Sequence, residues 1–248
     1  MIRKTVVAAT LAAAFAVSTP ASAAVITFTG NSPGDGADGN VRAFSADGIT
    51  VQATAWSYTG STLETAYLGS FSSGLGVTNP TEGDGSGNAH AVDNYLRNDF
   101  ILLVFNQAVN LSSAKLTPYS QNGQALDNDA SVSFATASGL FASTVPATTA
   151  IATSNAVFTA LNGNLWNVSG NLGTGFQTNL ASGSNAGNVW LIGAARSNSD
   201  NVLDGFKLSA ITVTSAVPEP GTWAMMLVGF GAIGASMRRR RTAVLRVA

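Results

Sequence analysis

The stretch FILLVF, residues 100–105, is apolar at all six positions. A strand that alternates apolar and polar side chains faces water on one side, whereas a strand that is apolar throughout is buried on both faces. A run of this length is usual for a strand and too short for a typical helix. We therefore predict that residues 100–105 form a central strand, with other parts of the chain packed against both of its faces.

Short runs of β-branched, aromatic and alanine residues surround this stretch, separated by turns rich in Gly, Asn and Asp. Alternation of side-chain size is clearest in ITVQATAWSY, residues 49–58. Further strands are expected at residues 25–29, 114–119, 131–137, 189–195 and 206–214. Residues 148–163 fit either a short helix or a pair of strands. Frequent short strands with turns between them predict an all-β body over residues 24–213, folded as a single jelly-roll-like β-sandwich.

The first 23 residues have the features of a secretory signal peptide. Arg3 and Lys4 precede an apolar run at residues 6–17, and residues with small side chains follow. An uncleaved anchor helix is the alternative, but the apolar run is shorter than the ~20 residues that a membrane span needs. We expect signal peptidase to cut after residue 23, so that the protein is exported. The residues of this cleavage site are Ala21, Ala23 and Ala24.

A second apolar stretch, residues 222–237, lies near the C-terminus and is followed by four arginines. Its segment GFGAIG, residues 229–234, matches a dinucleotide-binding fingerprint, but that function needs a preceding strand and an acidic residue ~20 positions later. The chain ends before such a residue, so we reject nucleotide binding. We expect residues 222–237 to form a transmembrane helix with the arginines on the cytoplasmic side. The preceding residues, 214–221, are expected to form an extended linker.

The order of features in residues 217–241 resembles the PEP-CTERM sorting signal, in its PEPxxWA variant. A Pro-Glu-Pro motif is followed by Trp-Ala, a glycine-containing apolar helix and a basic cluster. The residues that carry the resemblance are Pro218, Glu219, Pro220, Trp223, Ala224, Arg238, Arg239, Arg240 and Arg241. The resemblance implies that an exosortase, a membrane enzyme of Gram-negative proteobacteria, processes the chain near this motif. Until that processing, the C-terminal helix is expected to anchor the chain transiently in the inner membrane, and the body is then delivered to the cell surface or exopolysaccharide matrix. Such a tail implies an address and not an activity.

The composition of the body excludes several classes of function. Between Ala24 and Val217 there are five basic and twelve acidic residues. Nucleic-acid binding needs clustered Lys and Arg, so we exclude it. The chain has no cysteine, a single histidine and neither the GxSxG nor the HExxH motif. We therefore expect a non-catalytic structural or glycan-binding protein. An extracellular polysaccharide hydrolase with a carboxylate pair is the alternative.

Oxygen-bearing side chains recur at alternate positions in EGDGSGNAHAVD, residues 82–93. The spacing is that of an EF-hand-type calcium loop, with a glycine at its sixth position. The candidate Ca²⁺ ligands are Glu82, Asp84, Ser86, Asn88 and Asp93. The first position is Glu rather than Asp, the last is Asp rather than Glu, and no flanking helices are expected, so a solvated loop is the alternative. Asp35, Asp38 and Asn40 form a second acidic turn, which is also a candidate for calcium binding. An ordinary hairpin turn is the alternative.

Aromatic side chains provide a candidate glycan site. Trp56 and Tyr58 are two positions apart in the predicted strand 49–58, so their side chains lie on the same face. A flat ring stacks on the face of a pyranose, and this pair forms a candidate platform for a polysaccharide. Packing of these rings in the core is the alternative. Trp190 lies within an apolar run and is expected in the core.

Overall fold

The computed structural model describes residues 23–31, 36–58, 60, 62–83, 90–137, 150–152, 156–163, 165–170, 177–178, 185–216 and 220–244. The chain divides into two units. One covers Ser22–Val217 and is called the body here, and the other includes Pro218–Ala248.

The body consists mostly of β-strands, which confirms the predicted all-β class. The strands are β1 (Ala24–Thr27), β2 (Arg42–Ala46), β3 (Ile49–Tyr58), β4 (Thr62–Phe71), β5 (Gly74–Thr78), β6 (Val92–Asp93), β7 (Asn98–Pro118), β8 (Ala130–Ala135), β9 (Ala150–Ala152), β10 (Trp166–Val168), β11 (Gln177–Thr178), β12 (Gly187–Ala194) and β13 (Gly205–Ser215). Residues 148–163, which fitted a helix or a strand pair, contain both β9 and a helix, α1 (Ala156–Gly163).

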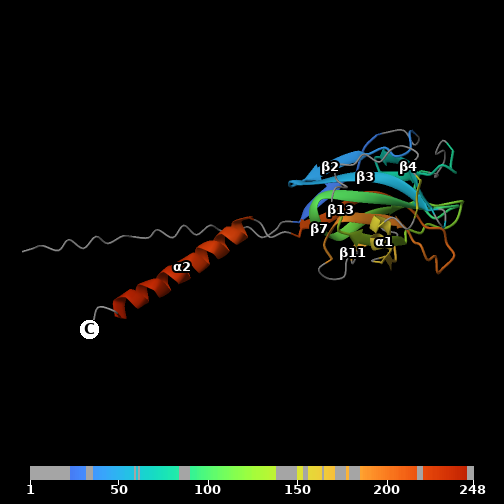
Figure 1. The fold of residues 1–248 in the computed structure, drawn as a ribbon. Helices are drawn as coiled ribbons and strands as arrows, with labels where there is room; N and C mark the ends of the chain where they lie inside the picture. Colours follow the sequence, from blue (N-terminus) through green and yellow to red (C-terminus); the bar gives the residue numbers. More distant parts are fainter. Residues whose placement is uncertain are drawn as a thin grey trace, which may run out of the picture. The chain divides into compact units, whose positions relative to one another are not determined.

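Five antiparallel strands close into a barrel in the order β13, β5, β4, β3, β7. The ring closes because β7 is 21 residues long, so that it pairs with β3 along its first half and with β13 along its second half. Residues 98–105 of β7 pair with β3, and residues 109–118 pair with β13. Figure 1 shows β7 and β13 side by side in the body. Two register shifts in the β13–β7 ladder mark local bends that help a sheet curl.

The predicted sandwich is not what the described strands form. A sandwich needs two separate sheets, whereas the thirteen described strands belong to one hydrogen-bonded sheet that closes on itself. The physical reason lies in β7, which we expected as two strands, at residues 100–105 and 114–119. As one continuous strand it carries the hydrogen bonding from β3 around to β13. From the other edge of its first half, β12, β8 and β10 extend the sheet beyond the barrel.

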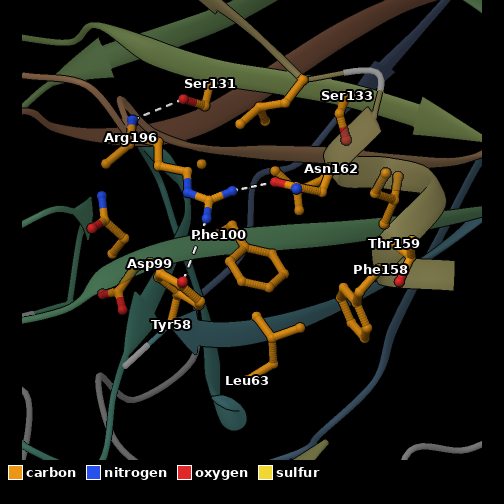
Figure 2. A pocket seen from close by; sticks show the side chains of 16 residues that line it. Tyr58, Leu63, Asp99, Phe100, Ser131, Ser133, Phe158, Thr159, Asn162 and Arg196 are labelled. Atoms are coloured by element: carbon orange, nitrogen blue, oxygen red, sulfur yellow. Dashed lines mark hydrogen bonds between the residues drawn. The ribbon is translucent and has the colours of Figure 1, made fainter. Parts of the chain in front are cut away.

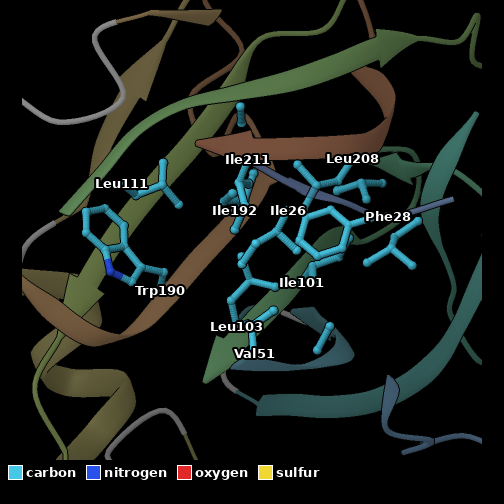
Figure 3. Close-up of a cluster of buried hydrophobic side chains, with 14 of the residues drawn as sticks. Ile26, Phe28, Val51, Ile101, Leu103, Leu111, Trp190, Ile192, Leu208 and Ile211 are labelled. Carbon is cyan, nitrogen blue, oxygen red and sulfur yellow. The ribbon is translucent and has the colours of Figure 1, made fainter. Parts of the chain in front are cut away.

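The stretch 100–105 is buried on both faces, as predicted. Its odd-numbered residues join the main core, where Ile101 and Leu103 pack near Ile26 and Val51 (Figure 3). Its even-numbered residues join a second cluster on the opposite face, which includes two side chains of α1. Leu103 is 0% exposed and Leu102 is 6% exposed. The first half of β7 therefore separates two hydrophobic clusters.

Small residues in β3 and β4 suit the interior of a narrow barrel. Ala53 and Ala55 in β3 and Ala66 in β4 belong to the main core and are fully buried. An eight-stranded barrel is just wide enough to be filled by side chains, and a five-stranded one has less room. Aromatic side chains pack against this core from outside these two strands. Phe28, which follows β1, lies edge-on to Phe44 of β2, with 4.9 Å between ring centroids.

The second unit contains the helix α2 (Pro220–Val244), which includes the apolar stretch and the arginines. Large apolar side chains along it, among them Leu227 and Phe230, are exposed. Within the parts of the chain that the structure describes, no helix has both the length and the apolar character needed to cross a membrane. The helix expected at residues 222–237 therefore forms, and its assignment as transmembrane is not confirmed.

Candidate functional site

Three acidic side chains meet near the start of β7. Glu82 lies in the turn after β5, Asp93 ends β6, and Asp99 is the second residue of β7. Each residue offers one carboxylate oxygen, and these oxygens lie within 4.8 Å of one another. We refer to them as the Glu82–Asp93–Asp99 cluster. Its members come from three separate segments. The spacing in residues 82–93 predicted a site that includes Glu82 and Asp93, and the fold adds Asp99.

Asn79 orders much of this cluster. Its Nδ2 donates to Oδ1 and Oδ2 of Asp99 at 3.1 and 3.2 Å. Its main-chain N–H donates to Oε2 of Glu82 at 2.7 Å. Oδ1 of Asp93 accepts a hydrogen bond from the main-chain N–H of Tyr95 at 2.9 Å. Oδ2 of Asp93 is buried and has no hydrogen-bond partner among the described residues.

Burial raises the pKa of all three carboxyl groups. Loss of solvent, together with the nearby charge of Asp93, raises the pKa of Glu82 to about 8. Loss of solvent raises the pKa of Asp93 to about 7. The pKa of Asp99 rises well above its ordinary value, first through burial and then through the charges of the other two. Arg97 opposes this rise only in part, and its guanidinium is ion-paired with Glu64.

A second acidic cluster consists of Asp127, Asp129 and Asp204, again with oxygens within 4.8 Å of one another. Here each carboxylate receives a hydrogen bond. Oδ2 of Asp204 accepts from Nδ2 of Asn94 at 2.6 Å, Oδ1 of Asp127 accepts from the main-chain N–H of Asp129 at 3.2 Å, and Gly170 donates to Asp129. Burial and the neighbouring aspartates raise the pKa of Asp204 to about 8.

A cavity of about 250 Å³ lies between α1 and the sheet formed by β7, β12 and β8. Apolar side chains line one part of it, among them Phe100 of β7 and Phe158 of α1. Polar side chains line the remainder and include Ser133 and Arg196 (Figure 2). Asp99 also lines the cavity, so the pocket and the Glu82–Asp93–Asp99 cluster share one residue.

Several contacts fix the position of Arg196 in the lining of this pocket. Its guanidinium lies 4.9 Å from the centroid of the Tyr58 ring, and its Nη2 donates to the Tyr58 hydroxyl at 3.4 Å. Its Nη1 donates to Oδ1 of Asn162, and its main-chain N–H donates to Oγ of Ser131 at 2.8 Å. Oγ of Ser133, also in the lining, is buried without a hydrogen-bond partner among the described residues. The pocket lining thus combines aromatic side chains with polar groups that can bind hydroxyls.

A buried lysine is a further feature that the sequence did not indicate. Lys207 of β13 is 1% exposed, and its Nζ donates to the main-chain oxygen of His90 at 2.7 Å. The same Nζ lies 3.7 Å from the centroid of the Phe71 ring and 5.1 Å from that of Tyr119. Burial lowers the pKa of Lys207 to about 7.

We expect Lys207→Met to change how stability depends on pH. The unfolded chain keeps a lysine pKa near 10.5, so between about pH 7 and pH 10 it binds more protons than the folded protein. The free-energy cost of burying the Lys207 cation therefore applies in full below about pH 7 and diminishes as the pH rises. The free energy of unfolding of Lys207→Met minus that of the wild type should therefore be larger at pH 6 than at pH 9, by roughly 2 kcal/mol. Urea unfolding at both values measures it, and a difference independent of pH would contradict the expectation.

The structure brings together only part of the predicted calcium site. Glu82 and Asp93 lie in one cluster, as the spacing predicted. Asp84, Ser86 and Asn88 lie outside the described residues. The third member of the cluster, Asp99, was not expected, although it directly precedes the apolar stretch 100–105 and so begins a buried strand.

The predicted glycan platform is wrong for Trp56. This side chain is 1% exposed and packs edge-on against Phe158 of α1, with 5.5 Å between ring centroids. Its Nε1 donates to Oγ1 of Thr54 at 3.0 Å. Tyr58, on the same strand face, instead lines the pocket. Trp190 is fully buried, as predicted.

The second acidic turn and the signal peptide are only partly within the described residues. Asp35 and residues 1–22, including Ala21, lie outside them, whereas Asp38 is described. Nδ2 and Oδ1 of Asn40 both bind the main chain of Leu68, at 3.0 and 2.7 Å, so this side chain connects the turn to β4. The predicted cleavage after Ala23 falls immediately before β1, which begins at Ala24.

The residues of the C-terminal motif extend into α2. Pro218 and Glu219 lie outside the described residues, Pro220 is the first residue of α2, and Trp223 and Ala224 belong to its first turns. Arg238, Arg239, Arg240 and Arg241 lie near its C-terminal end. The family profile of the PEP-CTERM protein-sorting motif matches residues 216–241.

The chain carries a PEP-CTERM sorting motif. The match supports the PEP-CTERM assignment without distinguishing the PEPxxWA variant. A PEP-CTERM motif implies processing by an exosortase, export and sorting to the cell surface. No curated protein and no solved structure matches this chain.

Proposed function

We propose that this protein is a non-catalytic, glycan-binding component of the cell surface or exopolysaccharide matrix. The sorting motif at residues 216–241 supports the location. The pocket lined by Arg196 supports the binding role, because aromatic rings and hydrogen-bonding groups line it together. A protein delivered to the surface would meet matrix polysaccharide there, and this pocket would bind it.

The combination of aromatic and polar side chains in the pocket lining carries the proposal. A sugar ring has apolar C–H faces and hydroxyls around its edge, so it needs ring surfaces and polar groups in one place. Phe100 and Phe158 supply apolar surface, while Arg196 and the buried hydroxyl of Ser133 supply polar groups. Ligand pockets usually measure ~300–1,000 Å³. The cavity of about 250 Å³ is therefore suited to one sugar unit and not to a long oligosaccharide.

The number of carboxyl groups that line the pocket decides between binding and hydrolysis. A glycosidase of the usual kind needs two carboxyl groups on either side of the scissile bond. Asp99 is the one carboxylate among the described residues that line the cavity. Glu82 and Asp93 lie near it, but they belong to the acidic cluster and are not in the lining. For this reason we favour binding over hydrolysis.

The proposal is tested by screening the purified full-length protein on an array of bacterial exopolysaccharide fragments and measuring affinity for the fragments retained. Arg196→Met should weaken this binding about tenfold or more, because a hydrogen bond from a charged group contributes ~1.5–3 kcal/mol. Lys115→Met removes a cation of β7 that does not line the pocket, and it should leave affinity unchanged.

Two results would contradict the proposal. One is a failure of the Arg196 pocket to account for binding, seen either as retention of no fragment at all or as equal binding by Arg196→Met and the wild type. The other is the release of new reducing ends from a retained polysaccharide, which would support the hydrolase instead.

A further inference from the structure

The Glu82–Asp93–Asp99 cluster has the donor set of a metal site. Its three oxygens come from the turn after β5, from β6 and from β7, and they lie within 4.8 Å of one another. Asp93 is 0% exposed and Asp99 is 1% exposed. Like charges at this distance repel each other strongly where water is excluded. The basic side chain that partly offsets this repulsion at Asp99 is Arg97, which is already paired with Glu64.

An unpartnered oxygen in the cluster points to a ligand. Oδ1 of Asp93 accepts a hydrogen bond from Tyr95, but Oδ2 is buried and receives none from any described residue. Leaving a charged oxygen buried without a partner is costly, and folded proteins rarely do so. The second acidic cluster does not share this feature, because among the described residues no carboxylate oxygen of Asp127, Asp129 or Asp204 is both buried and without a hydrogen-bond partner.

We propose that Glu82, Asp93 and Asp99 bind one calcium ion. Carboxylate oxygens without sulfur or imidazole ligands suit a hard cation. Calcium accepts six to eight oxygens in an irregular arrangement, including bidentate carboxylates. Magnesium demands a regular octahedron and keeps several of its waters, which two fully buried carboxylates leave little room for. The ion neutralises the repulsion and gives Oδ2 of Asp93 its missing partner.

The site has a consequence for the fold around it. A shared ion ties the turn after β5 to β6 and to the first residues of β7. Asp99 also lines the pocket, so the ion fixes one part of the pocket wall. The inference goes beyond the proposed glycan binding and does not depend on it, because calcium alone is the ligand tested.

The experiment follows thermal unfolding of the full-length protein, stripped of metal with a chelator, as calcium chloride is added. A ligand that binds only the folded state raises the melting temperature. Extracellular calcium sites commonly have dissociation constants of ~10⁻⁴–10⁻³ M. We therefore expect a rise of several degrees at about 10 mM calcium, with saturation that fits one ion per chain.

Isosteric variants separate calcium binding from a merely structural role. Asp93→Asn and Asp99→Asn remove one like charge each, so in chelator we expect them to be at least as stable as the wild type. In calcium, both should lose the rise in melting temperature. Asp127→Asn makes the same change in the second cluster, and it should keep the rise.

Three outcomes would overturn the proposal. They are an unchanged melting temperature of the wild type in calcium, a full rise in Asp93→Asn, and stabilisation by magnesium or manganese without stabilisation by calcium.

Discussion

Leu103→Ala is expected to lower the free energy of unfolding by about 2–5 kcal/mol, and Leu102→Ala by a comparable amount. The two side chains are neighbours on β7 and point to opposite faces, one into the barrel core and the other into the cluster under α1. Leu103 is 0% exposed and Leu102 is 6% exposed, so truncation of either leaves a cavity in packed surroundings. Chemical denaturation of the purified variants measures both losses.

Val25→Ala provides the control for this pair. Val25 lies on β1, and its side chain is 50% exposed, so a loss within about 0.5 kcal/mol is expected. If Leu102→Ala behaved like Val25→Ala while Leu103→Ala was severe, β7 would be buried on one face only. The arrangement of two clusters around β7 would then be incorrect.

Gly76→Ala is expected to destabilise the body by about 2 kcal/mol or more, through overpacking. A Cβ at this position of β5 would lie 1.9 Å from the main-chain oxygen of His90 and 2.9 Å from Nζ of Lys207. The lysine could shift, but the His90 oxygen belongs to the backbone. That oxygen also accepts the hydrogen bond of Lys207, so moving it weakens the contact that satisfies the buried cation.

Gly163→Ala is the matched control for Gly76→Ala. Gly163 ends α1, and a Cβ there would meet nothing within 4 Å. Its effect on the free energy of unfolding should be close to zero or slightly stabilising. Equal stability of Gly76→Ala and Gly163→Ala in thermal and urea unfolding would show that β5 does not approach residue 90 as closely as described.

Much of the fold follows from local patterns of side chains. The stretch 100–105 indicated a strand buried on both faces, and residues 49–58 coincide with β3. Strands β4 and β5 were not expected. Glu64 and Gly69 interrupt the apolar pattern of β4, and two glycines interrupt that of β5. The closure of the barrel was also missed. It depends on the pairing of β7 with β13, about a hundred residues later, which no local periodicity encodes.

The candidate sites, like the barrel, could be predicted only where they depend on residues close together in the sequence. The spacing in residues 82–93 placed Glu82 and Asp93 in one acidic site, whereas Asp99 joins them only through the fold. Trp56 and Tyr58 share a strand face as the alternation predicted. The packing of α1 on that face decides that the first ring is buried and that the second borders the pocket. Residues on α1 are a hundred positions away in the sequence, and their contacts cannot be deduced from the strand alone.

The central claim is that the chain is exported and then processed at its PEP-CTERM motif. The measurement that tests it most directly is the intact mass of the protein recovered from the surface of a Gram-negative host that has an exosortase, compared with the same host without one. We expect the recovered protein to begin at Ala24 and to lack α2 when the exosortase is present, and to retain α2 when it is absent. A surface protein that still begins at Met1, or that has the same C-terminal end in both hosts, would contradict the account.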